Sequence, residues 1–256
     1  PENSPAAIAS ISQSSATEPA VIPYAAQERA TEQMVETALS DGSDRRHQGR
    51  AFLAGNAAKP RGEARTVVPG LKALAMSGNA AASFALWQWL EACHRQTVAA
   101  NPDRSVDCTG VGTSDLAERS TFLEFAAAHG DPNAVLQFPI TAGMRFLGPD
   151  GRPNGTVLAR DPEAYVAFRR NAMAYLEASA LSGNVRSLNA LADAYSQGLL
   201  VQPDQVAALA YALAADRTGL SPGSGPWLER LRSPLSPAER QRAEAQARVI
   251  LSRCCR

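Results

Sequence analysis

The sequence predicts an all-α protein made of repeated pairs of helices, and three observations support this prediction. Alanine is used heavily, whereas aromatic residues make up only 6% of the chain and β-branched residues are sparse, which favours helices over strands. Gly183 and Gly219 each follow an alanine-rich segment and lie 36 residues apart, the length of one helix-turn-helix unit. Small and apolar residues recur at intervals of three and four after Gly183, as on the buried face of a helix.

The clearest unit covers residues 175–219. Gly198 ends its first helix, because glycine readily adopts the left-handed conformation of a helix C-terminus. Pro203-Asp204 then begins a second helix, which we expect to end at Ala214-Ala215. The unit is therefore predicted to be two antiparallel helices. The first helix, which follows Gly183, carries a predicted buried stripe: Ser187, Leu188, Leu191, Ala192 and Tyr195.

The same order of residues recurs upstream after Gly78 and Gly130. A degenerate copy surrounds Gly42, which lies 36 residues before Gly78. Four or five repeats are therefore expected. The third repeat carries Pro139 where its first helix should continue, so we expect that helix to stop or kink there. The matching residues at plus four and plus eight are Ala82 and Leu86 after Gly78, Ala134 and Phe138 after Gly130, and Ser187 and Leu191 after Gly183.

Two insertions interrupt the repeats. Gly78, Gly130 and Gly183 are separated by 52 and 53 residues, about 16 more than one unit. We place the insertions at about residues 93–113 and 147–160. The second begins with a glycine- and proline-rich stretch, Leu147 to Gly155, whose turn chemistry predicts a surface loop.

The two ends of the chain differ from the repeats between them. Residues 1–23 are rich in Pro, Ala and Ser without helical periodicity, which predicts a flexible tether before a repeat domain at 24–256. Because the first residue is Pro1, we expect that an upstream piece was removed, either a secretory or lipoprotein signal or only an expression tag. A lipoprotein signal would place a lipid anchor upstream of residue 1. At the other end, Ser236 and Glu239 form a capping box for a terminal helix at 237–253, a capping element for the repeats.

The pattern after Gly183 resembles the Sel-like repeat, a relative of the tetratricopeptide repeat. The pattern consists of small residues at plus four, Leu at plus eight, Tyr195 at plus twelve, Gly198 at plus fifteen and an Ala-Ala pair before the next Gly. The resemblance is good over 175–219 and partial over 71–91 and 122–138. It implies a right-handed α/α superhelix whose concave face binds proteins or peptides. Members act as adaptors, secretion or envelope regulators and antitoxin-like inhibitors, and the resemblance supplies no catalytic site.

Charge and hydropathy restrict the class of partner. Lys plus Arg and Asp plus Glu both number 25, so no net field draws the chain to nucleic acid or an anionic membrane. No apolar run approaches the roughly 18 residues that a membrane-spanning helix requires. The expected partner is another protein, of the envelope or secreted, and the oligomeric state stays open.

The spacing of two cysteines suggests a disulfide. Cys93 and Cys108 are fifteen residues apart across the first insertion, so a disulfide between them would tie that insertion to its helix in an oxidising compartment. The alternative is two reduced, buried thiols in a cytosolic protein. A metal site with His94 lacks the second close pair of ligands that structural zinc requires. Cys254-Cys255 is free, mutually oxidised or crosslinked between chains.

Candidate partner-binding residues follow from the helical register. The polar stripe opposite the buried one tends to face the groove in this family, although such a stripe is more often only a solvated face. Trp87 and Trp89 point about 200° apart on one helix, so we expect that both cannot be core and that one, Trp87 among the candidates, is an exposed anchor. The alternative is that the insertion covers both. The stripe comprises Gln88, Glu91, Asn189, Asp193 and Gln197.

No catalytic motif is evident. The three histidines, His47, His94 and His129, stand in no nucleophile-elbow or zinc-protease motif, and no phosphate-binding glycine loop occurs. The Asn154-Gly155-Thr156 sequon is taken as incidental. We expect no enzymatic activity, no cofactor and no metal. The expected role is a scaffold or inhibitor in the bacterial periplasm or tethered to the outer membrane, with an immunity protein as a specific version. The alternatives are a cell-wall glycan hydrolase on a helical superstructure and a self-assembling spacer.

Overall fold

The computed structural model describes residues 50–99, 105–147, 154–221 and 224–255. These residues form ten α-helices, one 3-10 helix and two strands of two residues each, so the all-α prediction is confirmed. The predicted tether at 1–23 and the degenerate copy around Gly42 lie outside the described residues, as do parts of both insertions.

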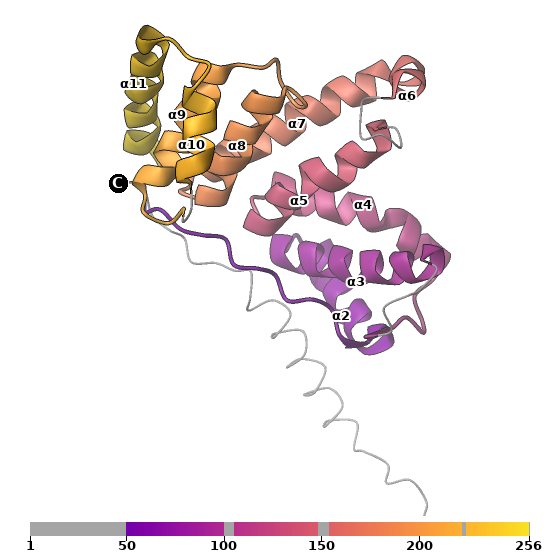
Figure 1. Ribbon diagram of the computed structural model, residues 1–256. Coiled ribbons are helices and arrows are strands. Elements are labelled where there is room, and N and C mark those ends of the chain that lie inside the picture. The colour runs from indigo at the N-terminus through magenta and orange to yellow at the C-terminus, as the bar shows by residue number, and fades with distance from the viewer. Residues whose placement is uncertain (1–49, 100–104, 148–153, 222–223, 256) are drawn as a thin grey trace, which may run out of the picture.

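The helices pack mainly on their neighbours in the sequence and follow one another across the molecule (Figure 1). Helix α2 packs on α3, α3 on α4, α4 on α5, α5 on α7, α7 on α8, and α9 on both α8 and α11. The elements are β1 (Gly62–Glu63), α2 (Ala64–Met76), α3 (Ala80–Val98), β2 (Val106–Asp107), α4 (Thr113–Ala128), α5 (Pro132–Gly143), η1 (Met144–Phe146), α6 (Gly155–Arg160), α7 (Pro162–Leu181), α8 (Val185–Gln197), α9 (Gln205–Arg217), α10 (Gly225–Arg232) and α11 (Pro237–Cys254).

Three turns of one design precede α3, α5 and α8. Each turn contains a glycine in the left-handed region, with φ of 94° at Gly78, 81° at Gly130 and 100° at Gly183. The next residue, an Asn or Asp, caps the following helix by accepting hydrogen bonds from its first backbone N–H groups. We call α3, α5 and α8 the A helices. The residues predicted to correspond at plus four and plus eight are all buried: Ala82, Leu86, Ala134, Phe138, Ser187 and Leu191.

The unit at 175–219 follows its predicted outline closely. Four of the five residues in the predicted stripe are buried, and Tyr195 is half-buried. Gly198 ends α8 with a left-handed φ of 74°. Asp204 caps α9 by accepting from Val206 N and Ala207 N, and α9 runs to Arg217, two residues beyond its predicted end.

Helix α5 continues through Pro139 to Gly143, so of the two expected outcomes, a stop or a kink, the helix does not stop at the proline. Proline removes one backbone hydrogen bond from a helix interior. The capped N-terminus and the burial of Val135 and Phe138 hold the helix together on both sides of the missing bond.

Two predictions about helix boundaries meet different outcomes. The C-terminal helix, predicted at 237–253, spans Pro237–Cys254 and carries the expected capping box between Ser236 and Glu239, so this prediction is confirmed. The second insertion is not a loop throughout, because the short helix α6 begins at Gly155 with Asn154 as its cap.

Both tryptophans of α3 are buried, so the prediction that one is an exposed anchor is wrong. Trp87 is 6% exposed and stacks on Phe84 in the larger core cluster, whereas Trp89 is 5% exposed in the smaller one. The reason is tertiary: α3 lies between α2 and α4, so opposite faces of the same helix are covered.

An extended segment links the two ends of the molecule, and the repeat pattern does not predict it. Residues 50–61, which we call the strap, run from the C-terminal helices to β1 and α2 (Figure 1). At one end Phe52 forms a β-bridge with Asn184. At the other, β1 pairs in parallel with β2, with Gly62 opposite Val106.

Candidate protein-binding face

The A helix α8 carries one stripe of polar side chains along a single face. Arg186, Asn189, Asp193 and Gln197 follow one another at intervals of three and four, so they lie in line on the helix. Asp193 and Gln197 are exposed and Asn189 is half-buried. Protein atoms around the Asp193 carboxyl desolvate it and raise its pKa. We call these four residues the α8 stripe.

Asn189 anchors the middle of the α8 stripe. Its Nδ2 donates to Ser221 Oγ at 3.2 Å, across to the segment that follows α9. Its Oδ1 is shielded from solvent and has no hydrogen-bond partner among the described residues. An unpaired buried acceptor costs free energy, which a donor from a bound molecule would recover.

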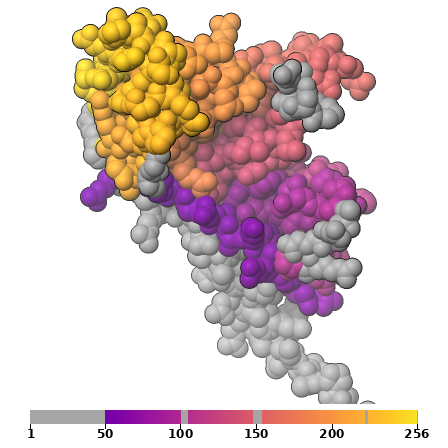
Figure 2. Space-filling model, viewed as in Figure 1, coloured from indigo at the N-terminus to yellow at the C-terminus, as the bar shows by residue number. Residues whose placement is uncertain are grey.

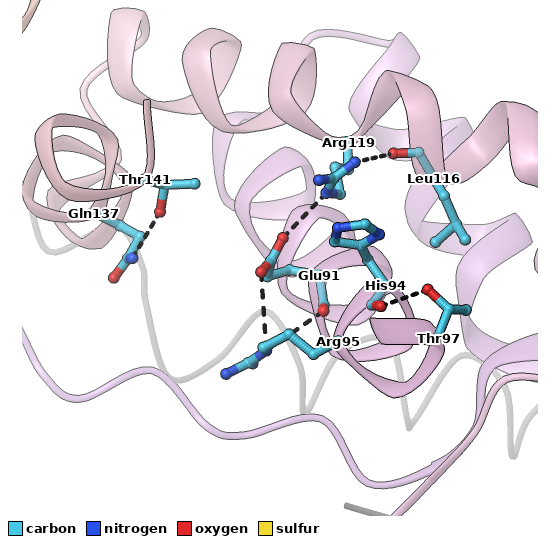
Figure 3. Close-up of polar contacts among 8 residues, drawn as sticks. All are labelled: Glu91, His94, Arg95, Thr97, Leu116, Arg119, Gln137 and Thr141. Carbon is cyan, nitrogen blue, oxygen red and sulfur yellow. Dashed lines mark hydrogen bonds and ion pairs between the residues drawn. The ribbon is translucent and has the colours of Figure 1, made fainter. Parts of the chain in front are cut away.

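On α3 the predicted residues have a different role. Glu91 forms ion pairs with Arg119 Nε of α4 at 3.1 Å and with Arg95 Nε at 3.9 Å (Figure 3). Arg119 also donates to Leu116 O at 2.6 Å, which fixes its position. Glu91 therefore joins α3 to α4, and its carboxylate is already occupied. Gln88, one turn before it, is half-buried.

Between these helices, α5 and the start of η1 present an exposed apolar pair that the sequence did not predict. Ile140 is 61% exposed and Met144, one turn later, is 66% exposed. Counted from the repeat glycine, Ile140 is at plus ten, the position of Gln88 on α3 and Asp193 on α8. Repeat position alone, without a requirement for a polar residue, would therefore have predicted Ile140 as a candidate. On the same helix, Gln137 donates to Thr141 Oγ1 at 2.8 Å (Figure 3).

The A helices thus combine polar and apolar side chains at corresponding positions. Helix α5 contacts α8 directly. Protein interfaces commonly have an apolar centre and a polar rim. Exposed apolar side chains thus lie on α5 and at the start of η1, and exposed polar side chains lie on α8.

The structure brings the sulfur atoms of Cys93 and Cys108 to disulfide distance, 2.15 Å apart, with their Cα atoms 5.5 Å apart. Cys93 is buried on α3 and Cys108 follows β2. Close by, Gln96 Nε2 donates to Val106 O at 2.9 Å, a second tie between α3 and β2. The pair therefore holds the described part of the first insertion against α3, as expected for the predicted disulfide.

Cys254 and Cys255 also lie at disulfide distance, with their sulfur atoms 2.11 Å apart. Of the three alternatives left by the sequence, this arrangement is the mutually oxidised one. Cys254 is buried where α11 ends.

Two further titratable residues, His129 and Asp131, are held by contacts within the fold. His129 Nδ1 lies 2.8 Å from Phe125 O, and the two rings stack at 3.9 Å at the end of α4. Asp131 is buried at the N-terminus of α5, and burial raises its pKa to about 6 although its Oδ1 accepts from two backbone N–H groups. Among the described residues no three His, Cys, Asp or Glu side chains gather as a metal site would require.

Within the part of the chain that the structure describes, no helix has both the length and the apolar character of a membrane span. Comparison with protein-family models finds none that matches this chain, and a search of curated proteins finds no match either.

Proposed function

We propose that this chain is a non-catalytic protein-binding scaffold or inhibitor of the bacterial envelope. In this proposal its helical pairs form a right-handed α/α superhelix of the Sel-like kind, and the A helices line the face that holds the partner. The shared register of α3, α5 and α8 supports the arrangement, because the same positions after Gly78, Gly130 and Gly183 are buried in each.

The observation that carries the proposal is the exposed pair formed by Ile140 on the central A helix and Met144 at the start of η1. Large apolar side chains that lie together at a surface expose area whose burial against a partner is favourable by about 25 cal/mol per Å². The α8 stripe, on a helix that contacts α5, offers amide and carboxylate groups for hydrogen bonds that give orientation and specificity.

The cysteine geometry supports an envelope location. Disulfides persist in oxidising compartments such as the periplasm and are rare in the cytosol. Thiol labelling before and after reduction, on protein isolated from its own compartment, tests this location. Cys93 and Cys108 should resist labelling until they are reduced, and free labelling of both would contradict an envelope location.

A photocrosslinking experiment tests the binding face. Ile140 is replaced with p-benzoylphenylalanine in the full chain, which is then irradiated in cells. Val249 on α11 is the matched control, since it is also an exposed apolar residue but lies on the terminal helix, away from α5. We expect one discrete adduct with another protein from position 140 and none from position 249.

Charged substitutions at Ile140 and Met144 test whether binding is lost. Ile140→Arg combined with Met144→Arg should abolish the adduct from a neighbouring probe at Gln137, while the melting temperature stays within a few degrees, because both side chains are exposed. Equal adducts from positions 140 and 249, or an adduct that persists in the double arginine variant, would contradict the proposed face.

A further inference from the structure

The strap is seated on the N-terminal edge of α8 in the manner of a bound peptide. Phe52 N donates to Gly183 O at 2.9 Å, and Val185 N donates to Phe52 O at 2.9 Å. This exchange of two backbone hydrogen bonds is the unit of strand pairing, by which proteins often hold extended peptides. We call Gly183, Val185 and Arg186 the seat.

The seat also contacts the strap beyond this bridge. Arg186 Nη1 donates to Ala54 O at 3.3 Å and lies 3.4 Å from Asn56 Oδ1, so one guanidinium group holds two acceptors of the strap. Ala54 is buried, which leaves room only for a small side chain at that position. The seat therefore requires a residue that donates and accepts through its backbone, a small residue two positions later and an acceptor two positions after that.

The seat is also continuous with the proposed binding face. Arg186 is the first member of the α8 stripe, which continues through Asn189 and Asp193. An extended segment held at the seat thus lies beside the polar side chains that we assign to partner recognition.

The other two repeat turns lack this seat. A Cβ added at Gly183 would lie 2.4 Å from Arg50 O, whereas one added at Gly78 or Gly130 would meet nothing within 4 Å. The third repeat has Pro132 where α8 has Val185, and proline has no N–H to donate. The seat is thus a specialised feature of α8 and not a general property of the repeat.

We propose that the seat is a binding site for an extended segment of the partner protein, and that the strap is a resident competitor for it. This inference rests on the proposed function and names the chemistry of the partner segment: a residue with a free backbone N–H and C=O, then a small residue, then a hydrogen-bond acceptor, at alternate positions. Because the strap is part of the same chain, its effective concentration at the seat is on the order of millimolar. A partner segment must therefore compete with it, and the strap limits binding to segments that match this pattern.

The strap is accessible for such an exchange. It lies at the molecular surface between the C-terminal and the N-terminal helices (Figure 2). Three of its own residues, Leu53, Gly55 and Asn56, are exposed. Displacement of the strap therefore requires the loss of the bridge, the Arg186 contacts, the burial of Ala54 and the packing of Ala51 and Ala57 against the larger core cluster.

The probe for this proposal is a fluorescent synthetic peptide of residues 50–61, added to the full chain and followed by anisotropy. A released variant, Phe52→Pro with Ala54→Arg, weakens the strap and leaves the seat unchanged, since both substitutions lie in the strap. We expect the released variant to bind the probe at least tenfold more tightly than the unaltered chain. A peptide with Pro at the Phe52 position should not bind either chain.

The seat itself is tested by two substitutions in the released variant. Val185→Pro removes the donor that pairs with Phe52 O, and proline is already present at the corresponding position of α5. Val185→Ala, the matched control, keeps the N–H and has its counterpart in Ala80 of α3. Binding should fall at least tenfold more with Val185→Pro than with Val185→Ala, and equal binding by the two would overturn the proposal.

A second measurement needs no altered strap. In the unaltered chain, saturating peptide should accelerate hydrogen exchange at the Phe52 amide, because the displaced strap loses its bond to Gly183 O. No acceleration would overturn the proposal even if the released variant failed to fold. Neither assay contains a partner, so their failure leaves the proposed binding face untouched, whereas failure of the Ile140 crosslink leaves the peptide seat untouched.

Discussion

Corresponding residues of the three repeat turns have the same backbone role but different neighbours. Asn79, Asp131 and Asn184 each cap an A helix, yet only Asp131 carries a charge into the interior. Gly78 and Gly183 both adopt a left-handed conformation, yet only Gly183 lies against another segment of chain. Substitutions at equivalent positions therefore separate the backbone role from the local contact.

Gly183→Ala should destabilise the protein more than Gly130→Ala. Both variants place alanine in the left-handed region, at a cost of about 1–2 kcal/mol. Only at position 183 does the new methyl group also lie 2.4 Å from Arg50 O, so the start of the strap must move. Chemical denaturation measures the difference, and hydrogen exchange at the Phe52 amide should accelerate in the first variant alone. Equal destabilisation with unchanged exchange would show that the strap does not occupy the Gly183 turn in solution.

Asp131→Asn should stabilise the protein at neutral pH. The folded pKa of Asp131, about 6, lies above its ordinary value of 3.8, so the folded chain binds a proton that the unfolded chain releases between these values. The free energy of unfolding therefore falls as pH rises from about 4 to 6 and then levels off, a loss of about 3 kcal/mol at most. Asparagine caps a helix as well as aspartate and carries no charge.

The check is urea denaturation of the unaltered chain and of Asp131→Asn at pH 4 and pH 7.5. The variant should be more stable by about 1–3 kcal/mol at pH 7.5 and nearly equal at pH 4. The other carboxyl groups titrate alike in both proteins, so the difference isolates Asp131. A variant that is less stable at pH 7.5 would mean that the charged form makes a favourable contact beyond its two backbone hydrogen bonds.

At the scale of elements, the first insertion depends on its connections more than on its own core. The described part consists of β2 and the residues that lead into α4, and it is held by Cys93, by Gln96 and by β1. The third repeat offers the opposite case, since α5 tolerates Pro139 because packing compensates for one lost hydrogen bond.

Replacing Cys93 and Cys108 together with alanine should lower the free energy of unfolding by about 3 kcal/mol, the chain-entropy value for a loop of about 15 residues. Cys254→Ala with Cys255→Ala is the matched control, because adjacent cysteines enclose no loop and little change is expected. Calorimetry under oxidising conditions measures both. A drop of similar size in the control would show that the loss of buried sulfur atoms, and not loop closure, accounts for the change.

At the scale of the whole molecule, the core is divided into two clusters. Trp89, Leu86 and Val67 belong to the cluster between α2 and α3, whereas Trp87 and Leu191 belong to the larger cluster that extends to α11. Helix α3 contributes to both, and the strap connects their ends. Because helices pack mostly on their sequence neighbours, we expect the two clusters to open with partial independence.

Leu86→Ala and Leu191→Ala test this independence. The two leucines occupy the same position of their repeats and both are fully buried, so each truncation should cost about 2–5 kcal/mol. Native-state hydrogen exchange should accelerate mainly in α2 and α3 for the first variant and mainly in α8 and α9 for the second. Uniform acceleration in both variants would indicate a single cooperative unit.

The sequence by itself determined the local structure of this protein. Glycine, capping residues and helical periodicity are signals carried by neighbouring residues, so they predicted the helical class, the turns at Gly130 and Gly183, the buried positions after them and the terminal helix. The spacing of Cys93 and Cys108 likewise indicated which sulfur atoms come together.

Only the tertiary structure decided what each helix face meets. Periodicity places Trp87 and Trp89 on opposite faces, but it does not reveal that helices cover both. The strap has no periodicity at all, and its seat joins Phe52 to Gly183 across more than half the chain. Exposure of Ile140 depends in the same way on which side of α5 its neighbours leave open. Such contacts depend on how distant elements pack, and no local pattern of residues encodes that packing.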